Sequence, residues 1–159
     1  MTTSARLEPG DEAPAFALPD QHGRTVALSA LRGRRVVLYT YPEAMTPGCT
    51  TESCDFRDAR ADILAAGFEL LGLSSDAPEK NAEFDAAERL GFALLSDEDH
   101  AVQRAYGAYG ERNKYGRIAV GPIRSTFVIG ADGRIEHALY NVRASGHVGR
   151  LRAILGLDG

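Results

Sequence analysis

The sequence predicts an α/β fold in which helices flank a central mixed β-sheet. Residues 35–41 and 68–74 are short, nearly continuous apolar runs, as expected of strands buried on both faces. Residues 50–66 between them carry apolar side chains at helical spacing. A strand–helix–strand unit of this length makes its two strands parallel. Two later runs, 124–129 and 134–140, are joined by Ala-Asp-Gly, which predicts an antiparallel hairpin.

The composition is that of an ordinary globular protein, and we expect one domain over residues 1–159. The net charge of -4 offers no electrostatic footprint for nucleic acid or an anionic membrane. No apolar run approaches a membrane span, and the opening MTTSARLEPGDEAP lacks the apolar core of a secretory signal. We therefore expect a cytoplasmic protein. In that compartment a cysteine pair is more often catalytic, redox-sensing or metal-binding than structural.

The other elements follow from turn signals in chain order. Residues 9–33 alternate turn residues with short apolar pieces, which predicts a hairpin or two short strands and a one-turn helix near 29–31. Pro78 indicates the first turn of a helix, with Ser75 or Asp76 as its N-cap. Its inward residues are predicted to be Phe84, Ala87 and Leu90. The remaining predictions are a strand at 92–95, a helix at 97–105, a Gly- and Tyr-rich loop at 106–122 and a helix at 145–155.

The only two cysteines, Cys49 and Cys54, lie where the first buried strand leads into the helix. Ligands of such folds bind at the carboxyl ends of parallel strands, where helices begin. A thiol must ionise to attack, and a free cysteine has a pKa of about 8.5. The preceding residues Thr46, Pro47 and Gly48 suit a helix start, because Thr caps, Pro fits the first turn and Gly allows close approach. The N–H groups and the dipole of that helix end favour a thiolate.

A cation from elsewhere in the chain is a second possible aid to the thiolate. Arg124 is the best candidate, because it begins a strand whose following residues have the pattern of a buried strand. Spacing along the chain is weak ground for choosing among the arginines. The structure must decide this point.

The spacing of the two cysteines sets a geometric limit. Five residues along a helix advance about 7.5 Å and turn about 140°, which separates the Cα atoms by about 8 to 9 Å. A disulfide requires Cα atoms within about 7 Å. Cys49 shares an inward face with Phe56 and Ile63, whereas Cys54 is predicted near Asp58, toward solvent. A disulfide between them therefore requires the first helical turns to unwind.

The cysteines alone leave other functions open. They could be small buried apolar residues. Two thiols without a histidine nearby in the sequence make a poor zinc site, and we expect no metal. Their spacing is not the C-x-x-C of thioredoxin-like reductases. A disulfide reductase and a non-enzymatic, oxidant-sensing thiol switch both remain open as functions of the pair.

Residues 42–49, PEAMTPGC, match the P-x-x-x-T/S-x-x-C signature of the peroxiredoxins. The continuation CTTESCDFRD resembles their bacterioferritin-comigratory-protein (Q-type) branch, and the likeness extends to GDEAPAFALPDQHGRTVALSALRG, RVVLYTYP and RSTFVIGADGRIEH. The resemblance implies a thioredoxin-like fold and a monomeric, thioredoxin-dependent peroxidase without a cofactor. Two departures are Ala44-Met45, where the family often has a charged or amide pair, and Thr40, where an aromatic residue is common. We interpret Thr40 as a packing change.

The resemblance also implies roles for the two thiols. Cys49 would be the peroxidatic nucleophile that reduces hydrogen peroxide or an organic hydroperoxide and becomes a sulfenic acid. Cys54 would be the resolving thiol that closes an intramolecular disulfide with it, the expected next oxidation state. Thioredoxin or a similar dithiol would then reduce this disulfide.

Five further residues receive roles from the same resemblance. Thr46 and Arg124 would position and polarise the peroxide oxygens. Pro42 would shield the thiolate, and the backbone N–H of Gly48 or of the nucleophile itself would donate to the peroxide. Glu52 would orient an arginine. Three of the five also have a plainer explanation: Thr46 as a simple N-cap, Arg124 in an ion pair at a strand end, and Glu52 as an ordinary first-turn residue.

Overall fold

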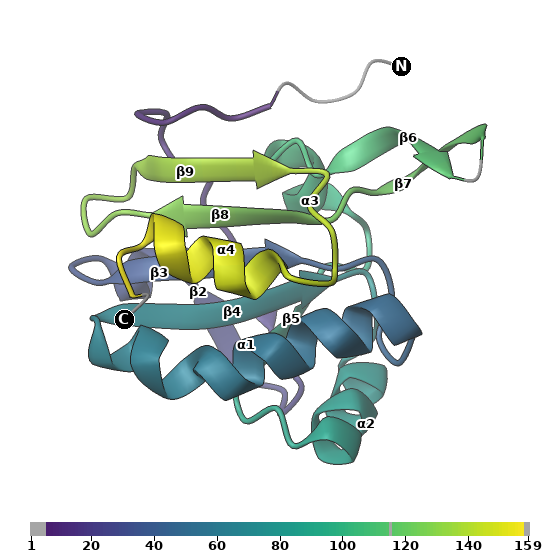
Figure 1. Cartoon of the computed structure of the whole chain (residues 1–159), viewed down its shortest axis with the longest axis horizontal. Coiled ribbons are helices and arrows are strands. Elements are labelled where there is room, and N and C mark those ends of the chain that lie inside the picture. The colour runs from purple at the N-terminus through teal and green to yellow at the C-terminus, as the bar shows by residue number, and fades with distance from the viewer. Residues whose placement is uncertain (1–5, 115, 158–159) are drawn as a thin grey trace.

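The computed structural model describes residues 6–114 and 116–157. Its centre is a five-stranded sheet with the strand order β5-β4-β3-β8-β9 (Figure 1). The strands are β3 (Arg35–Thr40), β4 (Phe68–Ser74), β5 (Ala93–Ser96), β8 (Ser125–Ile129) and β9 (Ile135–Tyr140). β3, β4 and β5 are parallel, whereas β8 runs antiparallel to β3 and β9. The predicted α/β class with a mixed sheet is confirmed.

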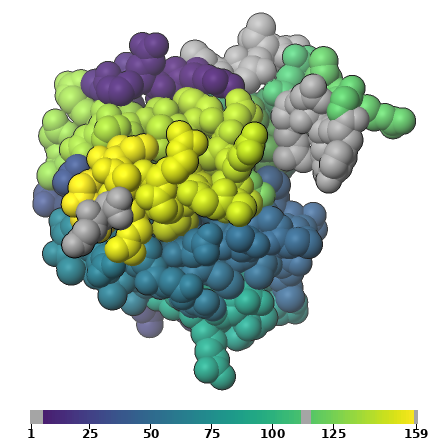
Figure 2. All heavy atoms as spheres, viewed as in Figure 1, coloured from purple at the N-terminus to yellow at the C-terminus, as the bar shows by residue number. Residues whose placement is uncertain are grey.

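Helices and a small hairpin cover the two faces of this sheet. α1 (Pro47–Ala65) and α4 (His147–Ile154) lie side by side on one face and fill much of it in Figure 2. α2 (Pro78–Glu88) adds Phe84 to the same core. The opposite face packs against the hairpin of β1 (Ala17–Pro19) and β2 (Thr25–Ala27), the single-turn helix η1 (Leu28–Leu31) and α3 (Ala101–Ala105).

Strand β3 shows how the sequence builds two cores at once. Successive side chains of a strand point to opposite faces. Val37 and Tyr39 enter the core beneath α1 and α4, whereas Val36 and Leu38 enter the core beneath the N-terminal hairpin. All four are almost completely buried, so the continuous apolar run is explained by burial on both faces.

The prediction for the start of α2 was partly wrong. The helix begins at Pro78, but its N-cap is Ala77, and no side chain caps it. The carboxylate of Asp76, a predicted cap, instead accepts a hydrogen bond from the backbone N–H of Ala44 at 2.7 Å. This contact ties the loop after β3 to the loop after β4. Ala87, predicted to face inward, is exposed.

The prediction of a loop over residues 106–122 was also wrong. The segment forms an antiparallel hairpin of β6 (Tyr109–Lys114) and β7 (Arg117–Pro122), which extends away from the central sheet (Figure 1). Ile118 and Val120 on β7 are 73% and 68% exposed. A strand without a buried face lacks the alternation by which strands are recognised in a sequence. No helix in the described ranges is long and apolar enough to cross a membrane.

Candidate active site

The first turn of α1 carries Cys49. The helix begins at Pro47, three residues earlier than predicted, so Cys49 is its third residue and is only 1% exposed. Thr46 occupies the N-cap position, but its hydroxyl donates to the Glu43 carbonyl at 2.7 Å and does not cap a helix N–H. The first N–H groups of a helix have no acceptor within it, so this end of α1 attracts negative charge.

Arg124 lies directly beside the Cys49 sulfur. Its Nη2 is 3.4 Å from Sγ, and its Nη1 donates to Oε1 of Glu52 at 2.6 Å. Cys49 and Glu52 are neighbouring buried positions on α1, whereas Arg124 comes from the segment just before β8. A Cβ on Gly48 would lie 3.3 Å from Arg124 Nη2, so glycine here leaves room for the guanidinium. The structure thus selects Arg124 from among the arginines and places Glu52 against it.

Thr40 fixes the backbone on both sides of Arg124. Its hydroxyl accepts a hydrogen bond from the N–H of Ser125 at 3.0 Å and donates to the carbonyl of Ile123 at 2.9 Å. The side chain is completely buried and lies opposite Ser125 in the β3–β8 register. The interpretation of Thr40 as a packing change was therefore incomplete. At the other departure from the family pattern, Met45 is half exposed with a left-handed φ of 67°.

Glu52 is a buried carboxylic acid with an unusual balance of forces. Burial raises the pKa of Glu52 to about 7, although the adjacent Arg124 acts to lower it. Within the described residues Oε2 is buried without a hydrogen-bond partner, while Oε1 receives Arg124. Desolvation disfavours the charged form of a carboxyl. Glu52 is consequently expected to change its charge near neutral pH.

Replacing Glu52 with glutamine should remove a pH dependence of stability. The folded-state pKa of about 7 lies above the unfolded value of 4.5, so folding strengthens proton binding. This contribution is fully present below pH 4.5 and is lost as the pH rises through about 7. Between these limits wild type should lose up to about 3 kcal/mol relative to Glu52→Gln. Urea unfolding followed by circular dichroism measures the difference.

The matched control for this experiment is Glu136→Gln. Glu136 pairs with Arg35 at 2.6 Å, but its side chain is 37% exposed, so little of its charge is desolvated. The free energy of unfolding of Glu136→Gln should change with pH in parallel with that of wild type over the same pH range. If the stability curves of wild type and Glu52→Gln run parallel with pH, the pKa of Glu52 is not raised by folding.

An open pocket of about 510 Å³ gives access to the guanidinium. Pro42, Glu111 and Val142 line it together with Arg124, so it joins the loop after β3 to the hairpin and to the segment after β9. Pro42 and Arg124, both predicted site residues, therefore face one opening. A small polar molecule that entered here would meet the guanidinium that touches the buried sulfur.

Cys54 lies five residues, about 1.4 turns, further along α1. Both cysteines are free thiols on an uninterrupted helix. Cys54 is half-buried and is not fully turned to solvent as predicted, because its Sγ donates to Oε1 of Glu88 at 3.4 Å. Burial raises the pKa of the Cys54 thiol, and the Glu88 carboxylate raises it further.

His147 was not recognised from the sequence as part of this region. It is buried at the start of α4, its Nε2 lies 2.7 Å from the Thr126 hydroxyl, and its ring meets Phe56 edge-on. Burial, with Arg150 and Arg124, lowers the pKa of His147 to about 4, so it is neutral at physiological pH. No spacing along the chain would have identified it.

Among the described residues no three His, Cys, Asp or Glu side chains gather as metal ligands.

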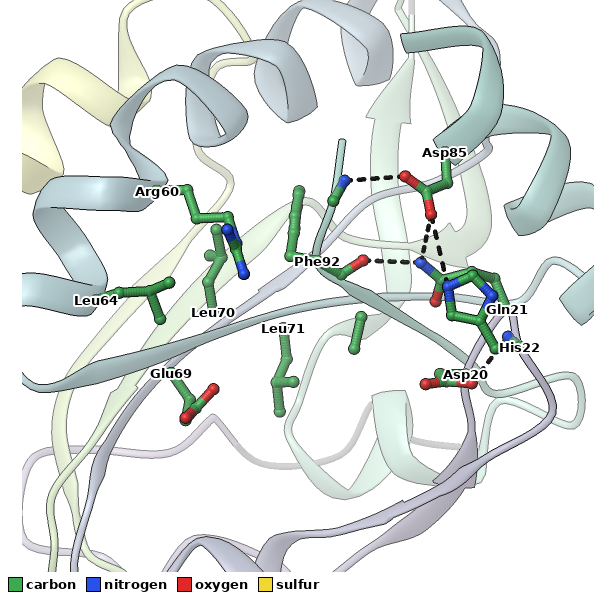
Figure 3. Close-up of a pocket in the computed structure, with 12 residues that line it drawn as sticks. Asp20, Gln21, His22, Arg60, Leu64, Glu69, Leu70, Leu71, Asp85 and Phe92 are labelled. Atoms are coloured by element: carbon green, nitrogen blue, oxygen red, sulfur yellow. Dashed lines mark hydrogen bonds and ion pairs between the residues drawn. The ribbon is translucent and has the colours of Figure 1, made fainter. Parts of the chain in front are cut away.

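A second pocket, of about 260 Å³, lies away from both cysteines (Figure 3). Arg60 and Leu64 of α1 and Asp85 of α2 border it. Gln21 lies in the wall of this pocket, and its Nε2 donates to Asp85 Oδ2 at 2.9 Å and to the Phe92 carbonyl at 2.8 Å. These contacts join the N-terminal hairpin to α2 and β5. No cysteine is among the described residues that line this pocket.

Comparison with known protein families gives a match over most of the chain. Residues 9–138 match the AhpC/TSA family. A putative peroxiredoxin of Mycobacterium tuberculosis is 54% identical over 157 residues, covering 99% of this chain and 100% of the relative. The peroxiredoxin Bcp of Escherichia coli is 47% identical over 141 residues, covering 89% of this chain and 90% of the relative.

Solved structures give the same result. The bacterioferritin comigratory protein of Xanthomonas campestris, studied for alkyl peroxide reduction, superposes with a TM-score of 0.86 at 34% identity and covers 94% of this chain and 98% of its own. A PrxQ cysteine mutant of Xylella fastidiosa has a TM-score of 0.89 at 28% identity, covering 96% and 98% of the two chains.

Proposed function

The chain belongs to the AhpC/TSA family as a peroxiredoxin, a thiol peroxidase, and we propose that Cys49 is the nucleophile that attacks the peroxide. One observation carries the proposal. The guanidinium of Arg124 bridges the Cys49 sulfur at 3.4 Å and the Glu52 carboxyl at 2.6 Å, at the first turn of α1. A cation and a helix N-terminus together stabilise negative charge on the sulfur.

The proposed first step is a displacement at oxygen. The Cys49 thiolate forms an S–O bond while the O–O bond breaks, and the leaving oxygen takes up a proton to become water or an alcohol. The sulfur is oxidised by two electrons to a sulfenic acid, and the peroxide is reduced by the same two. Negative charge grows on the leaving oxygen, where fixed donors lower the barrier. Both hydrogen peroxide and organic hydroperoxides fit this chemistry.

The surrounding residues receive their roles from the same proposal. The Arg124 guanidinium and the Thr46 hydroxyl position and polarise the peroxide oxygens, with Arg124 held by Glu52. Pro42 shields the thiolate at the pocket that Arg124 also lines. The backbone N–H at Gly48, in the first turn of α1, is a further donor to the peroxide.

The proposed second step joins the two thiols. Cys54 attacks the sulfenic sulfur, the S–S bond forms, the S–O bond breaks, and the hydroxide leaves as water after taking up a proton. On the intact helix the two Cα atoms are about 8 to 9 Å apart, beyond the reach of a disulfide. The first turns of α1 therefore unwind before the bond closes.

The cycle is completed by an external reductant. We propose that thioredoxin or a similar dithiol reduces the disulfide, which returns both cysteines to the free state seen in the structure. This requires a compartment in which thiols stay reduced, for which the cytoplasm is the proposed site. The protein is proposed to act as a monomer, because both thiols are supplied by one helix.

One equivalent of hydrogen peroxide tests the proposal. Mass spectrometry of the treated protein should show the loss of two hydrogen atoms and a peptide that links Cys49 to Cys54. In the same sample, amide exchange over residues 49–56 should be faster than in the reduced protein, because those turns have unwound. A slow, single oxidation without turnover by thioredoxin and its reductase would point instead to a sensor.

A further inference from the structure

We propose that Glu88 is a positioning residue for the resolving step: its carboxylate accepts a hydrogen bond from the Cys54 thiol, holds that helical turn closed, and thereby sets the rate of disulfide formation. The inference rests on the proposed role of Cys54 as the resolving thiol. It adds a residue from a different helix, to which neither the sequence motif nor the family resemblance assigns a role.

Glu88 holds the relevant turn of α1 at two points. Its carboxylate accepts the Cys54 thiol at 3.4 Å, and its backbone carbonyl accepts Nη1 of Arg57 at 2.7 Å. Cys54 and Arg57 are three residues apart, so they occupy one turn of α1 and face the same neighbour. Any unwinding that carries Cys54 toward Cys49 must break the thiol contact.

The end of α2 is itself held in place. Glu88 is the last residue of the helix, and Arg89 follows in the left-handed conformation with φ of 53°. The last carbonyl groups of a helix receive no hydrogen bond from a backbone N–H within the helix. Arg57 supplies a donor to the carbonyl of Glu88. Asp85, one turn earlier, accepts the backbone N–H of Gly91 at 2.9 Å. Glu88 therefore contacts Cys54 from an anchored position.

The contact between Glu88 and Cys54 is favourable or unfavourable according to the charge of the sulfur. The groups that face the Cys54 sulfur are Glu88 from α2 and Arg57 and Asp58 from α1. A carboxylate accepts a hydrogen bond from a thiol but repels a thiolate. Glu88 thus stabilises the closed helix while Cys54 is protonated and destabilises it once Cys54 has ionised. Burial and Glu88 raise the pKa of the Cys54 thiol, in agreement with this geometry.

The contact with Glu88 therefore limits the reactivity of Cys54 while the helix is closed. While the helix is closed, Cys54 is kept as a thiol, which is not the nucleophilic form. Release of the turn removes it from Glu88 and frees it to ionise in water. The raised pKa leaves a smaller fraction of Cys54 as thiolate in the closed helix than in the released turn, which limits its reaction with other oxidants and with other thiols before the sulfenic acid forms.

The test is a comparison of Glu88→Gln with wild type in a timed quench after one equivalent of hydrogen peroxide. Mass spectrometry separates the sulfenic acid, which has gained one oxygen, from the disulfide, which has lost two hydrogens. The Gln side chain keeps the size and the acceptor but removes the charge. At neutral pH the disulfide should close about three- to tenfold faster in Glu88→Gln, as expected for a weakened hydrogen bond to a charged group. The ratio should fall toward or below one as the pH is raised far enough to ionise Cys54, whose thiol pKa is raised in the folded protein.

Asp58→Asn is the matched control. It removes a carboxylate from the same face of α1, but Asp58 is 68% exposed and its partner is Arg57. Closure in Asp58→Asn should stay within about twofold of wild type, as expected for an exposed ion pair. Equal closure rates for wild type and Glu88→Gln at all pH values would overturn the proposal. A ratio of the Glu88→Gln closure rate to the wild-type rate that exceeds one but does not change with pH would also overturn it. Such a ratio is expected from a loss of packing, which does not depend on the charge of Cys54.

The two proposals fail in different ways. If Cys54 is not the resolving thiol, wild type itself forms no Cys49–Cys54 disulfide, and the function proposed above is wrong. If wild type closes the disulfide and Glu88→Gln closes it at the same rate, only the role of Glu88 is wrong. Circular dichroism and urea unfolding of each variant show whether the fold is retained.

Discussion

Replacing Cys49 with serine is expected to lower the rate of peroxide consumption by at least about a thousandfold, as in other enzymes that lose their nucleophile. A serine hydroxyl stays protonated at neutral pH, and oxygen is not oxidised to an analogue of a sulfenic acid. The buried site should accept the smaller oxygen atom with little change in the fold. Loss of peroxide with thioredoxin, its reductase and NADPH supplied measures the effect.

The interpretation depends on an intact site. Serine at position 49 leaves the Arg124–Glu52 ion pair in place, so the circular dichroism spectrum should match wild type. Retention of more than a small part of the activity would place the reactive thiol elsewhere. Cys54 is the only other cysteine, and the double variant Cys49→Ser/Cys54→Ser sets the background rate.

Replacing Cys54 with serine should separate the two halves of the reaction. The variant keeps Cys49, Arg124 and the first turn of α1, so it should still consume one equivalent of peroxide. Its product should be the sulfenic acid, seen by mass spectrometry as the gain of one oxygen. Turnover with thioredoxin should fall to the background rate, because no disulfide forms for the reductant to open.

A small external thiol should partly restore turnover to Cys54→Ser. It can attack the sulfenic sulfur directly and form a mixed disulfide, which a second thiol molecule opens. Full turnover of Cys54→Ser with thioredoxin alone would show that the sulfenic acid is resolved by another molecule. The proposed unwinding of α1 would then have no place in the mechanism.

The structure also shows why some elements were easier to predict than others. β3 and β4 are buried on both faces, and their apolar runs are visible in any local window of the sequence. β6 and β7 pair only with each other and expose Ile118 and Val120, so their glycines were read as a loop. The N-cap predicted for α2 was wrong, and the carboxylate of Asp76 instead accepts the backbone N–H of Ala44 in the loop after β3.

Within the site, the amino-acid sequence predicts which thiol is the nucleophile, the helix that begins beside it, and a spacing of the two cysteines that does not fit a disulfide on an intact helix. Each of these depends on residues that are contiguous or on a single helix, where spacing sets geometry. Which groups surround the two sulfurs becomes visible only in the folded chain. Arg124 is 75 residues from Cys49, and Glu88 is 34 residues from Cys54. These neighbours come together because β8 pairs with β3 and the end of α2 packs on α1, and no local pattern encodes either contact.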